Sequence, residues 1–310
     1  MATVAAIDCG TNSIRLLIAE VDIDGNLIEL DRRMTIVRLG EGVDATGRFS
    51  DAAIERTFAA CDEYSLAIRS HEATHIRFVA TSATRDAENR EEFVAGVKAR
   101  LGCKVDVITG KEEAALSFLG ATGGLKESFE GPYLVIDIGG GSTEFVVGTD
   151  VPDAARSVDI GCVRMTERHL AGDPASAESI EAAIADIDAA ILKASKVVPF
   201  ADAKTVIGLA GSVTTVAAMA LGLQKYDRKA IHGSVISADA IHRVFDRLIH
   251  MTRAQRSELP FMHPGRVDVI GAGSLVLDRI MKILPQTSIV VSEHDILDGI
   301  AVDLAKKISK

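Results

Sequence analysis

A glycine-rich turn between two apolar runs carries the residue types that bind phosphate. The run Tyr133–Ile136 precedes Asp137, and the run Phe145–Val147 follows the stretch GGGSTE at residues 139–144. Short apolar runs rich in strand formers predict two strands joined by a tight turn. Glycine lets an anion approach backbone N–H groups closely, and hydroxyl groups add further donors. The residues expected to hold phosphate are Gly139, Gly140, Gly141, Ser142 and Thr143.

Two carboxylates, Asp137 and Glu144, bracket this turn. Carboxylate oxygens, together with the oxygens of a bound phosphate, are ligands that Mg²⁺ prefers in proteins. The pair therefore predicts a site for Mg²⁺, or for Mn²⁺, beside the phosphate. The alternative is a glycine-rich hairpin without a ligand, but a hairpin needs neither carboxylate.

The same pattern occurs near the N-terminus of the chain. Val4–Ile7 is apolar, Asp8 ends the run, and a small polar turn leads into a second apolar run, Ile14–Val21. Asp8 is expected to reach a metal through water. A motif that repeats after about 130 residues indicates two similar α/β domains, and ligands commonly bind in the cleft between domains. The turn residues expected to hold phosphate are Gly10, Thr11, Asn12 and Ser13.

The segments DCGTNS at residues 8–13 and DIGGGSTE at residues 137–144 resemble the two phosphate motifs of the exopolyphosphatase/guanosine pentaphosphate phosphohydrolase (Ppx/GppA) family. The likeness extends along essentially the whole chain. The resemblance places the chain in the actin-like ATPase and sugar kinase superfamily. It implies an α/β fold of two actin-like (ribonuclease H-like) domains that face each other across a cleft.

One further segment, TSATRDAEN at residues 81–89, resembles a family motif whose arginine meets a phosphate in the cleft. The resemblance assigns that role to Arg85. An arginine suits the task because its planar guanidinium matches two phosphate oxygens at once. The alternative is an ion pair at a helix end, with Asp86 or Glu88 as the partner.

The segment TGKEEA at residues 109–114 resembles a family motif whose second glutamate is the proposed general base, which is Glu113 here. A carboxylate at the mouth of a phosphate site can orient water and accept its proton. Nearby phosphates and Asp137 are expected to raise its pKa. The alternative is that Glu112 and Glu113 only complement a helix N-terminus, which is the better interpretation of Glu112.

A third phosphate-binding or nucleoside-binding element is expected where a strand at Thr205–Leu209 meets an apolar helix. In the superfamily a pair of glycines stands at this point, and this chain has Gly211 followed by Ser212. Backbone donors survive that change, so both residues are expected to contact ligand. Arg164 either faces the cleft or pairs with a nearby glutamate. The basic cluster at residues 225–232 is either a solvated loop or part of the site.

The polar, glycine-rich segment at residues 120–131 predicts a domain boundary near residue 125. Residues 1–124 would then hold the first turn and the general base, and residues 125–310 the second turn. The last helix, which ends near Ile308, is expected to pack back on the first domain. Asp24–Asn26 indicates a turn.

Composition narrows the functional class. A net charge of −10 argues against a general nucleic-acid binder. Thr205–Leu223 is free of charge, but glycine and hydroxyl residues interrupt it, which favours a buried strand, turn and helix over a membrane span. No signal peptide is evident, and four scattered cysteines indicate reduced thiols in the cytoplasm. One of them, Cys9, lies inside the first turn and is a candidate for oxidation.

Together these features lead us to expect an exopolyphosphatase that releases the terminal phosphate of inorganic polyphosphate by Mg²⁺-assisted attack of water. Short chains are the expected substrates, because longer family members continue into helical domains beyond the part matched here. The resemblance also implies a homodimer. The alternatives are hydrolysis of guanosine pentaphosphate, a phosphotransferase or kinase that uses the same cleft, and a non-catalytic nucleotide-binding or filament protein of the actin type.

Overall fold

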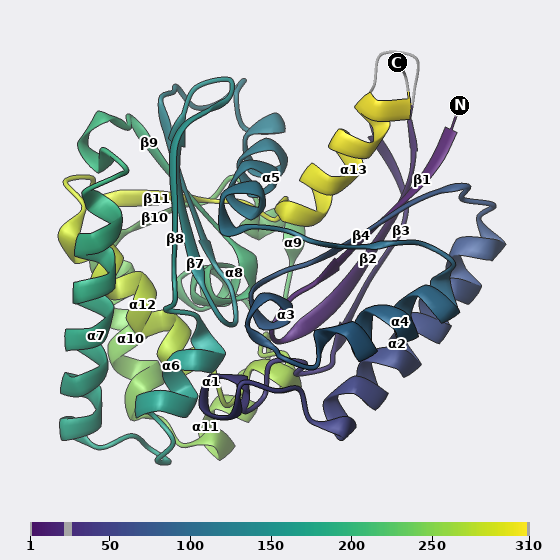
Figure 1. Ribbon diagram of the computed structural model, residues 1–310. Coiled ribbons are helices and arrows are strands. Elements are labelled where there is room, and N and C mark those ends of the chain that lie inside the picture. The colour runs from purple at the N-terminus through teal and green to yellow at the C-terminus, as the bar shows by residue number, and fades with distance from the viewer. Residues whose placement is uncertain (1, 22–26, 309–310) are drawn as a thin grey trace. The chain divides into compact units, whose positions relative to one another are not determined.

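The computed structural model describes residues 2–21 and 27–308, so the turn predicted at Asp24–Asn26 lies outside the described residues. The chain divides into two compact units, each built on its own sheet (Figure 1). Unit 1 comprises Met1–Gly120 and Ile296–Lys310, and unit 2 comprises Ala121–Asp295. The division therefore falls at residue 120 rather than 125, and the last helix, α13 (Ile296–Ile308), belongs to unit 1.

Unit 1 contains a five-stranded sheet in the order β3-β2-β1-β4-β5. β2 is antiparallel to both of its neighbours, β1 and β3, and β4 and β5 run parallel to β1. The strands are β1 (Ala2–Cys9), β2 (Ser13–Val21), β3 (Leu27–Ile36), β4 (His75–Ala80) and β5 (Val105–Val107). The helices are α1 (Val43–Thr46), α2 (Asp51–Ser70), α3 (Ser82–Asp86), α4 (Arg90–Leu101), α5 (Gly110–Gly123, whose last turn enters unit 2) and α13.

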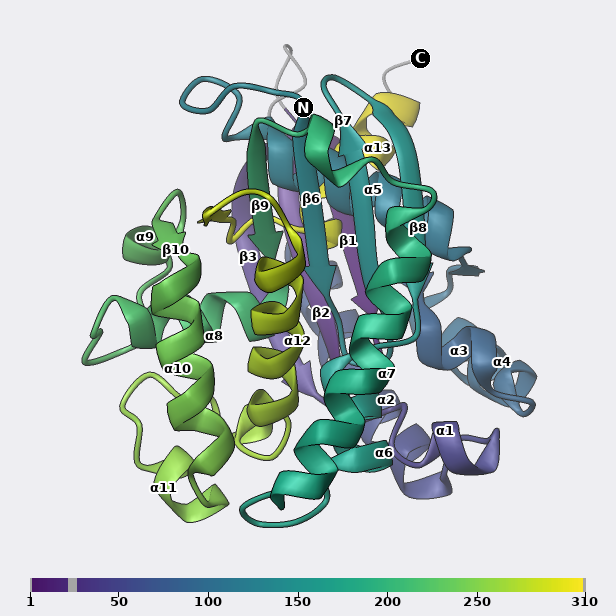
Figure 2. The same cartoon turned by 90° about the vertical axis from the view of Figure 1, so that its left-hand side faces the viewer.

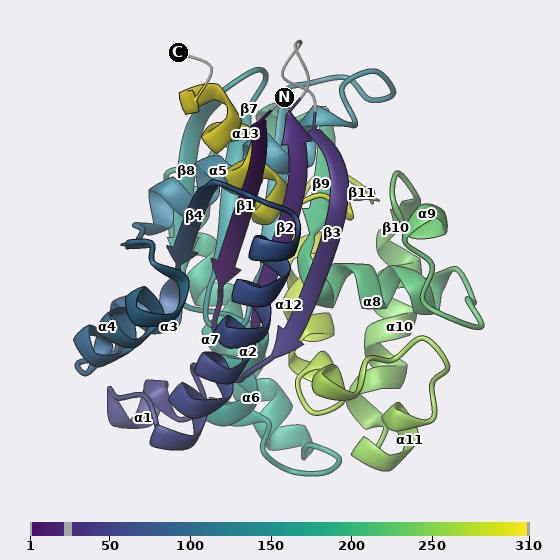
Figure 3. The same ribbon diagram turned by 90° about the vertical axis from the view of Figure 1, so that its right-hand side faces the viewer.

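Alternation along β1 distributes its side chains between two cores. Ile7 and Cys9 face the core formed with α2 and α4, which lie over one face of the sheet (Figure 3). Val4 and Ala6 face the opposite core, to which α5 and α13 contribute. Asp8 lies between Ile7 and Cys9 in sequence, so it projects to the α5 face. This alternation is what brings a strand-end carboxylate to the side of the sheet where Glu113 lies.

Unit 2 contains a six-stranded sheet in the order β10-β11-β9-β6-β7-β8. Helices α7, α8, α10 and α12 pack against one face of it, where Leu134, Ile136 and Phe145 are buried (Figure 2). The strands are β6 (Tyr133–Ile138), β7 (Thr143–Gly148), β8 (Pro152–Val158), β9 (Thr205–Leu209), β10 (Val235–Ser237) and β11 (Ser288–Val291). The helices are α6 (Cys162–His169), α7 (Ala177–Ser195), α8 (Ala210–Ala220), α9 (Arg228–Ile231), α10 (Ala238–His250), α11 (Arg253–Ser257) and α12 (Ile270–Ile283).

The two sheets share one topology, which confirms the predicted pair of α/β domains. The order β8-β7-β6-β9-β11 in unit 2 repeats β3-β2-β1-β4-β5 in unit 1, with the same strand directions. The register matches as well. Asp8 pairs with Arg15 across β1 and β2, and Asp137 pairs with Glu144 across β6 and β7. The two turns predicted from sequence are therefore equivalent points of a structural repeat.

Two expectations drawn from composition concern buried segments. Thr205–Leu223 forms β9 and α8, the strand and helix expected in place of a membrane span. Within the described part of the chain, no helix has both the length and the apolar character needed to cross a membrane. The thiol of Cys9 lies in the core, and burial raises its pKa well above the ordinary value. The structure therefore disfavours Cys9 as an oxidation site.

Candidate functional site

Two backbone N–H groups of the first turn have no hydrogen-bond acceptor among the described residues. Gly10 N donates to Ser13 O at 3.0 Å, which closes the turn. The following loop covers the turn's carbonyl groups, since Gly40 N donates to Thr11 O and two further N–H groups donate to Asn12 O. By contrast, the N–H groups of Thr11 and Asn12 have no acceptor among the described residues. The buried side-chain oxygen of Asn12 also has no partner there. Unmet backbone donors of this kind suit an anion.

The second turn repeats this arrangement. Gly139 N donates to Ser142 O at 3.0 Å, and the start of α6 covers the turn through Cys162 N, which donates to Gly139 O. Within residues 2–21 and 27–308, no acceptor faces the N–H groups of Gly140 and Gly141.

Glycine is required where α6 begins, because a Cβ at Gly161 would lie 2.2 Å from Gly140 O. Arg164 on α6 donates from Nε to Gly141 O at 2.8 Å. Of the two roles left open for Arg164, the structure therefore shows a contact that supports the turn itself.

The hydroxyl groups of the second turn already have protein acceptors. Ser142 Oγ donates to Glu144 Oε1 at 2.7 Å, and Thr143 Oγ1 donates to the carbonyl of Ile160 at 2.6 Å. Both side chains are buried. The backbone N–H groups of this turn, rather than its hydroxyl protons, are therefore the donors that would meet a phosphate.

Asp137 and Glu144 lie directly opposite each other on β6 and β7, and their side chains are 6% and 1% exposed. Like charges at opposed positions, with Cβ atoms about 5 Å apart, destabilise a sheet unless a cation balances them. The pair offers the hard oxygen ligands that Mg²⁺ requires. No group of three or more His, Cys, Asp or Glu side chains that could hold a metal occurs among the described residues. A cation here would thus complete its coordination with water and substrate oxygens, as Mg²⁺ commonly does.

Sequence reasoning missed Ser157, which lies opposite Glu144 on β8. Its Oγ donates to Glu144 Oε1 at 2.6 Å, so two hydroxyl groups hold the same carboxylate oxygen. No local motif marks Ser157, because its role depends only on strand register.

Asp8, at the equivalent place in unit 1, has a different partner. Arg15 on β2 donates from Nε to Asp8 Oδ2 at 3.0 Å. Arg15 occupies the repeat position that Glu144 occupies in unit 2. The first turn therefore has a built-in cation beside its carboxylate, whereas the second has two carboxylates. This charge difference favours Asp137 and Glu144 over Asp8 as direct metal ligands.

Unit 1 brings together three residues singled out from the sequence: Asp8, Arg85 and Glu113. Arg85 Nη1 donates to Glu113 Oε2 at 2.7 Å and to the carbonyl of Ile108 at 3.0 Å. The partner of Arg85 is therefore neither Asp86 nor Glu88. Neither Nε nor Nη2 of Arg85 has an acceptor in the part of the chain that the structure describes. That pair of nitrogens is the edge of a guanidinium that matches phosphate.

The side chain of Glu113 is buried, and its pKa is raised. The side chain lies in the first turn of α5 and is 8% exposed. Its pKa rises from 4.5 to about 7, because burial, aided by the negative charge of Asp8, outweighs Arg85 and a hydrogen bond with Thr81, which both lower it. The expected direction is confirmed. Burial and Asp8, rather than Asp137, are the causes in the protein itself, and an effect of bound phosphate stays a prediction. A carboxylate with a pKa near 7 suits proton transfer at neutral pH.

The neighbouring glutamate, Glu112, has a structural role. Its Oε2 accepts hydrogen bonds from the N–H and the hydroxyl of Thr109, each at 2.9 Å. These bonds lower the pKa of Glu112. Glu112 therefore caps the start of α5, as the sequence suggested.

Gly211 and Ser212 form the start of α8, which has no side-chain cap. The guanidinium of Arg266 lies against Gly211, where a Cβ would come within 2.5 Å of the arginine Cζ. Arg266 also donates to Thr215 Oγ1 at 3.2 Å. The Ser212 hydroxyl packs against Gly273, where a Cβ would be 2.3 Å away. The space beside Gly211 and Ser212 is therefore filled by protein contacts, so the expected ligand contacts would be made by the backbone, and Arg266 is a nearby cation.

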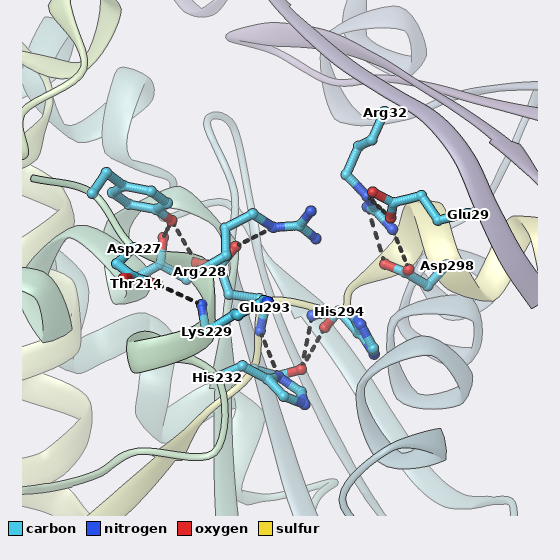
Figure 4. Close-up of polar contacts among 12 residues, drawn as sticks. Glu29, Arg32, Thr214, Asp227, Arg228, Lys229, His232, Glu293, His294 and Asp298 are labelled. Atoms are coloured by element: carbon cyan, nitrogen blue, oxygen red, sulfur yellow. Dashed lines mark hydrogen bonds and ion pairs between the residues drawn. The ribbon is translucent and has the colours of Figure 1, made fainter.

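The basic cluster at residues 225–232 belongs to an ordered network around Glu293 (Figure 4). Arg228 Nε donates to Glu293 Oε2 at 3.2 Å, and the Tyr226 hydroxyl donates to Glu293 Oε1 at 2.6 Å. Glu293 N in turn donates to His232 Nδ1 at 3.2 Å. Arg228 and His232 are thus held by Glu293, whereas Lys225 and Lys229 are exposed to solvent.

Comparisons with known proteins point to one family. The model of the Ppx/GppA phosphatase family matches residues 17–308. The chain is 47% identical to exopolyphosphatase 2 of Mycobacterium tuberculosis, across 98% of this chain and 99% of that protein. A crystal structure of an exopolyphosphatase-like protein matches with 44% identity and a TM-score of 0.95, across 99% of this chain and 100% of that one. The Aquifex aeolicus PPX-GPPA enzyme matches with 32% identity and a TM-score of 0.81, across 97% and 99%.

The buried carboxyl of Glu113 predicts a pH-dependent stability. Its pKa is higher in the folded chain than in the unfolded chain, so the protonated carboxyl favours folding. This stabilising contribution to the free energy of unfolding is fully present below about pH 4.5 and is lost as the pH rises through about 7. Glu113→Gln removes this loss. Relative to the wild type, the variant should therefore gain roughly 2 kcal/mol in free energy of unfolding between pH 5.5 and pH 8, measured by urea denaturation.

Glu112→Gln is the matched control, because the carboxyl of Glu112 is exposed and its pKa is lowered. Its stability difference from the wild type should stay constant over the same interval. Parallel curves for Glu113→Gln and the wild type would show that Glu113 titrates normally.

Proposed function

Because the chain belongs to the Ppx/GppA phosphatase family, we propose that it is an exopolyphosphatase that releases the terminal phosphate of inorganic polyphosphate, with short chains as its substrates. The observation that carries the proposal is the match to exopolyphosphatase 2 of Mycobacterium tuberculosis over nearly the full length of both chains. The buried pair of Arg85 and Glu113 supports it, because that pair supplies the base and the cation that hydrolysis of a phosphoanhydride needs.

Glu113 acts as the general base. It orients a water molecule and accepts a proton as the water oxygen forms a bond to the terminal phosphorus. The bond between that phosphorus and the bridging oxygen breaks, and its electron pair leaves on the shortened polyphosphate. A pKa of about 7 keeps a large fraction of Glu113 deprotonated at neutral pH while leaving it basic enough to take the proton.

Arg85 connects the base to the substrate. Its Nη1 holds Glu113, and its Nε and Nη2 contact oxygens of the phosphate under attack. The N–H groups of Thr11 and Asn12 in one turn, and of Gly140 and Gly141 in the other, bind phosphate oxygens. These donors are fixed by the backbone, so they need little reorganisation as charge develops. The start of α8 at Gly211 and Ser212 supplies further backbone donors.

We assign a divalent cation, Mg²⁺ or Mn²⁺, to Asp137 and Glu144. The donor set fits, because the two opposed carboxylates supply the hard oxygen ligands that Mg²⁺ prefers. When bound, such a cation neutralises charge on phosphate oxygens. Ser142 and Ser157 orient Glu144 by donating to one of its oxygens.

The proposed setting of the enzyme follows from the remaining sequence features. The four cysteines are free thiols, a usage typical of a reducing compartment, so we place the enzyme in the cytoplasm. We propose that it binds polyphosphate and forms a homodimer with a second copy of the chain. We do not expect it to bind nucleic acid or a membrane.

A phosphate-release assay tests the substrate. The purified protein, with Mg²⁺, is offered short-chain polyphosphate, long-chain polyphosphate, guanosine pentaphosphate and ATP in parallel. We expect release from polyphosphate, faster from short chains, and a loss of about 10²- to 10⁴-fold in kcat for Glu113→Gln. Glu112→Gln should retain wild-type activity, because that carboxylate only caps the helix.

Other outcomes of the same assay are equally informative. Release mainly from guanosine pentaphosphate would assign the other activity of the family. No release from any of the four compounds would contradict a phosphohydrolase and favour a kinase or a binding protein.

The assignment of the cation is tested by binding rather than by turnover. Added Mg²⁺ or Mn²⁺ should raise the free energy of unfolding of the wild type by roughly 2–3 kcal/mol when the metal concentration is 100-fold above its Kd. The gain is measured as a rise in the midpoint of thermal unfolding. The shift should vanish in Asp137→Asn and in Glu144→Gln. Asp150→Asn, at an exposed position in the same unit, serves as the control. Equal shifts in all variants would place the cation elsewhere.

A further inference from the structure

We propose that Gly299, near the C-terminal end of the chain, is a positioning residue for Glu113. Its lack of a side chain lets α13 approach α5 closely enough to fix the depth at which the base is held. The inference rests on the proposed function, because it gives Glu113 the role of general base.

The contact at Gly299 is between two backbones. A Cβ at this position would lie 1.9 Å from the carbonyl oxygen of Leu116 and 3.2 Å from the N–H nitrogen of Gly120, both on α5. A contact of 1.9 Å cannot occur, and no side-chain rotation can relieve it, because the obstructing atoms are backbone. Any residue other than glycine must separate the helices by about 1 Å to restore even a 3.0 Å contact.

The sheet holds α13 firmly, so α5 is the helix that would move. Leu297, Ile300 and Ala301 are buried in the core that faces β1 and β2, and Figure 1 shows α13 alongside β1. The two sides of α13 are also tied to the sheet by ion pairs. Arg32 on β3 binds Asp298, as Figure 4 shows, and Arg77 on β4 binds Asp303.

Glu113 lies one helical turn before Leu116, so a shift of α5 displaces its carboxylate. The guanidinium of Arg85 would not follow, because its Nη1 is also bound to the carbonyl of Ile108, which precedes α5. A displacement of about 1 Å would break the 2.7 Å hydrogen bond between Arg85 and Glu113. Misplacement of a reacting group by about 1 Å can cost about 10²-fold in rate.

The structural repeat adds an independent observation. Val105 on β5 and Val291 on β11 are equivalent in register, since Val105 pairs with Phe78 and Val291 pairs with Gly208. Counting the same number of residues onward from each leads to Glu113 in α5 and to Gly299 in α13. The position that carries the base in one copy of the repeat therefore carries no side chain in the other. The helices that hold these two positions, α5 and α13, contact each other on one face of the sheet in unit 1.

The test compares Gly299→Ala with Gly123→Ala, which places the same methyl group in α5 where nothing lies within 4 Å. We expect kcat on polyphosphate to fall roughly 10- to 100-fold in Gly299→Ala, while KM stays within about twofold. Gly123→Ala should keep wild-type kcat and KM. A folded Gly299→Ala variant with wild-type kcat would overturn the inference.

Two further variants separate positioning from a general loss of structure. In the double variant Gly299→Ala/Glu113→Gln, activity should be no lower than in Glu113→Gln alone, because a base that is already absent cannot be misplaced. Multiplication of the two losses would contradict the inference. If Gly299→Ala does not fold, Asp298→Asn loosens α13 without a clash and should lower kcat several-fold at constant KM. Unchanged kcat in that variant would count against the inference.

The wild-type assay keeps the inference separate from the function on which it rests. An inactive wild type would remove the proposed function and the inference together. An active wild type whose kcat does not depend on Gly299 would remove the inference alone.

Discussion

The proposed chemistry depends on one buried carboxylate, Glu113, whose ion pair with Arg85 does not fully offset the effect of burial. Glu113 and Arg85 form an ion pair, yet burial outweighs the attraction and the pKa of Glu113 rises to about 7. A fully compensated carboxylate would be a weak base, and an unpaired one would stay protonated at neutral pH. The balance between burial and ion pairing requires three elements to place their side chains on one face of the first sheet. β1 carries Asp8, α3 carries Arg85 and α5 carries Glu113.

The structural repeat shows how one backbone design supports two kinds of chemistry. Both copies close the turn with the same hydrogen bond, and both leave two N–H groups for an anion. They differ at the position that faces the strand-end aspartate, where Arg15 faces Asp8 in one copy and Glu144 faces Asp137 in the other. The first turn thus has an arginine beside its aspartate, whereas the second has two carboxylates, which is why we place the cation at the second turn. The two turns share one backbone arrangement, and this cross-strand pair distinguishes their chemistry.

Short-range patterns made the fold predictable, whereas the finer features of the site depend on contacts between distant segments. Two strand–turn–strand motifs ending in Asp8 and Asp137 indicated the repeated α/β domains that the sheets confirm. The role given to Glu113 came from family resemblance and not from spacing, and its closeness to Asp8 was not predicted. Burial as the main cause of its raised pKa was not predicted either, because burial is a property of the folded core. No local sequence pattern marks Ser157 or Gly299. Strand register gives Ser157 its role, and the contact between two helices gives Gly299 its role.

The most direct test of this account is a carbon-13 NMR titration of the glutamate carboxyl groups, with Glu113→Gln to assign the resonance of interest. We expect one carboxyl to titrate near pH 7 and to be missing from the variant. The same midpoint should govern the loss of kcat on polyphosphate at low pH, and Arg85→Met should move both midpoints upward, since Arg85 lowers the pKa. A Glu113 resonance that titrates near 4.5, or a kcat profile that does not follow it, would show that this carboxylate is not the base.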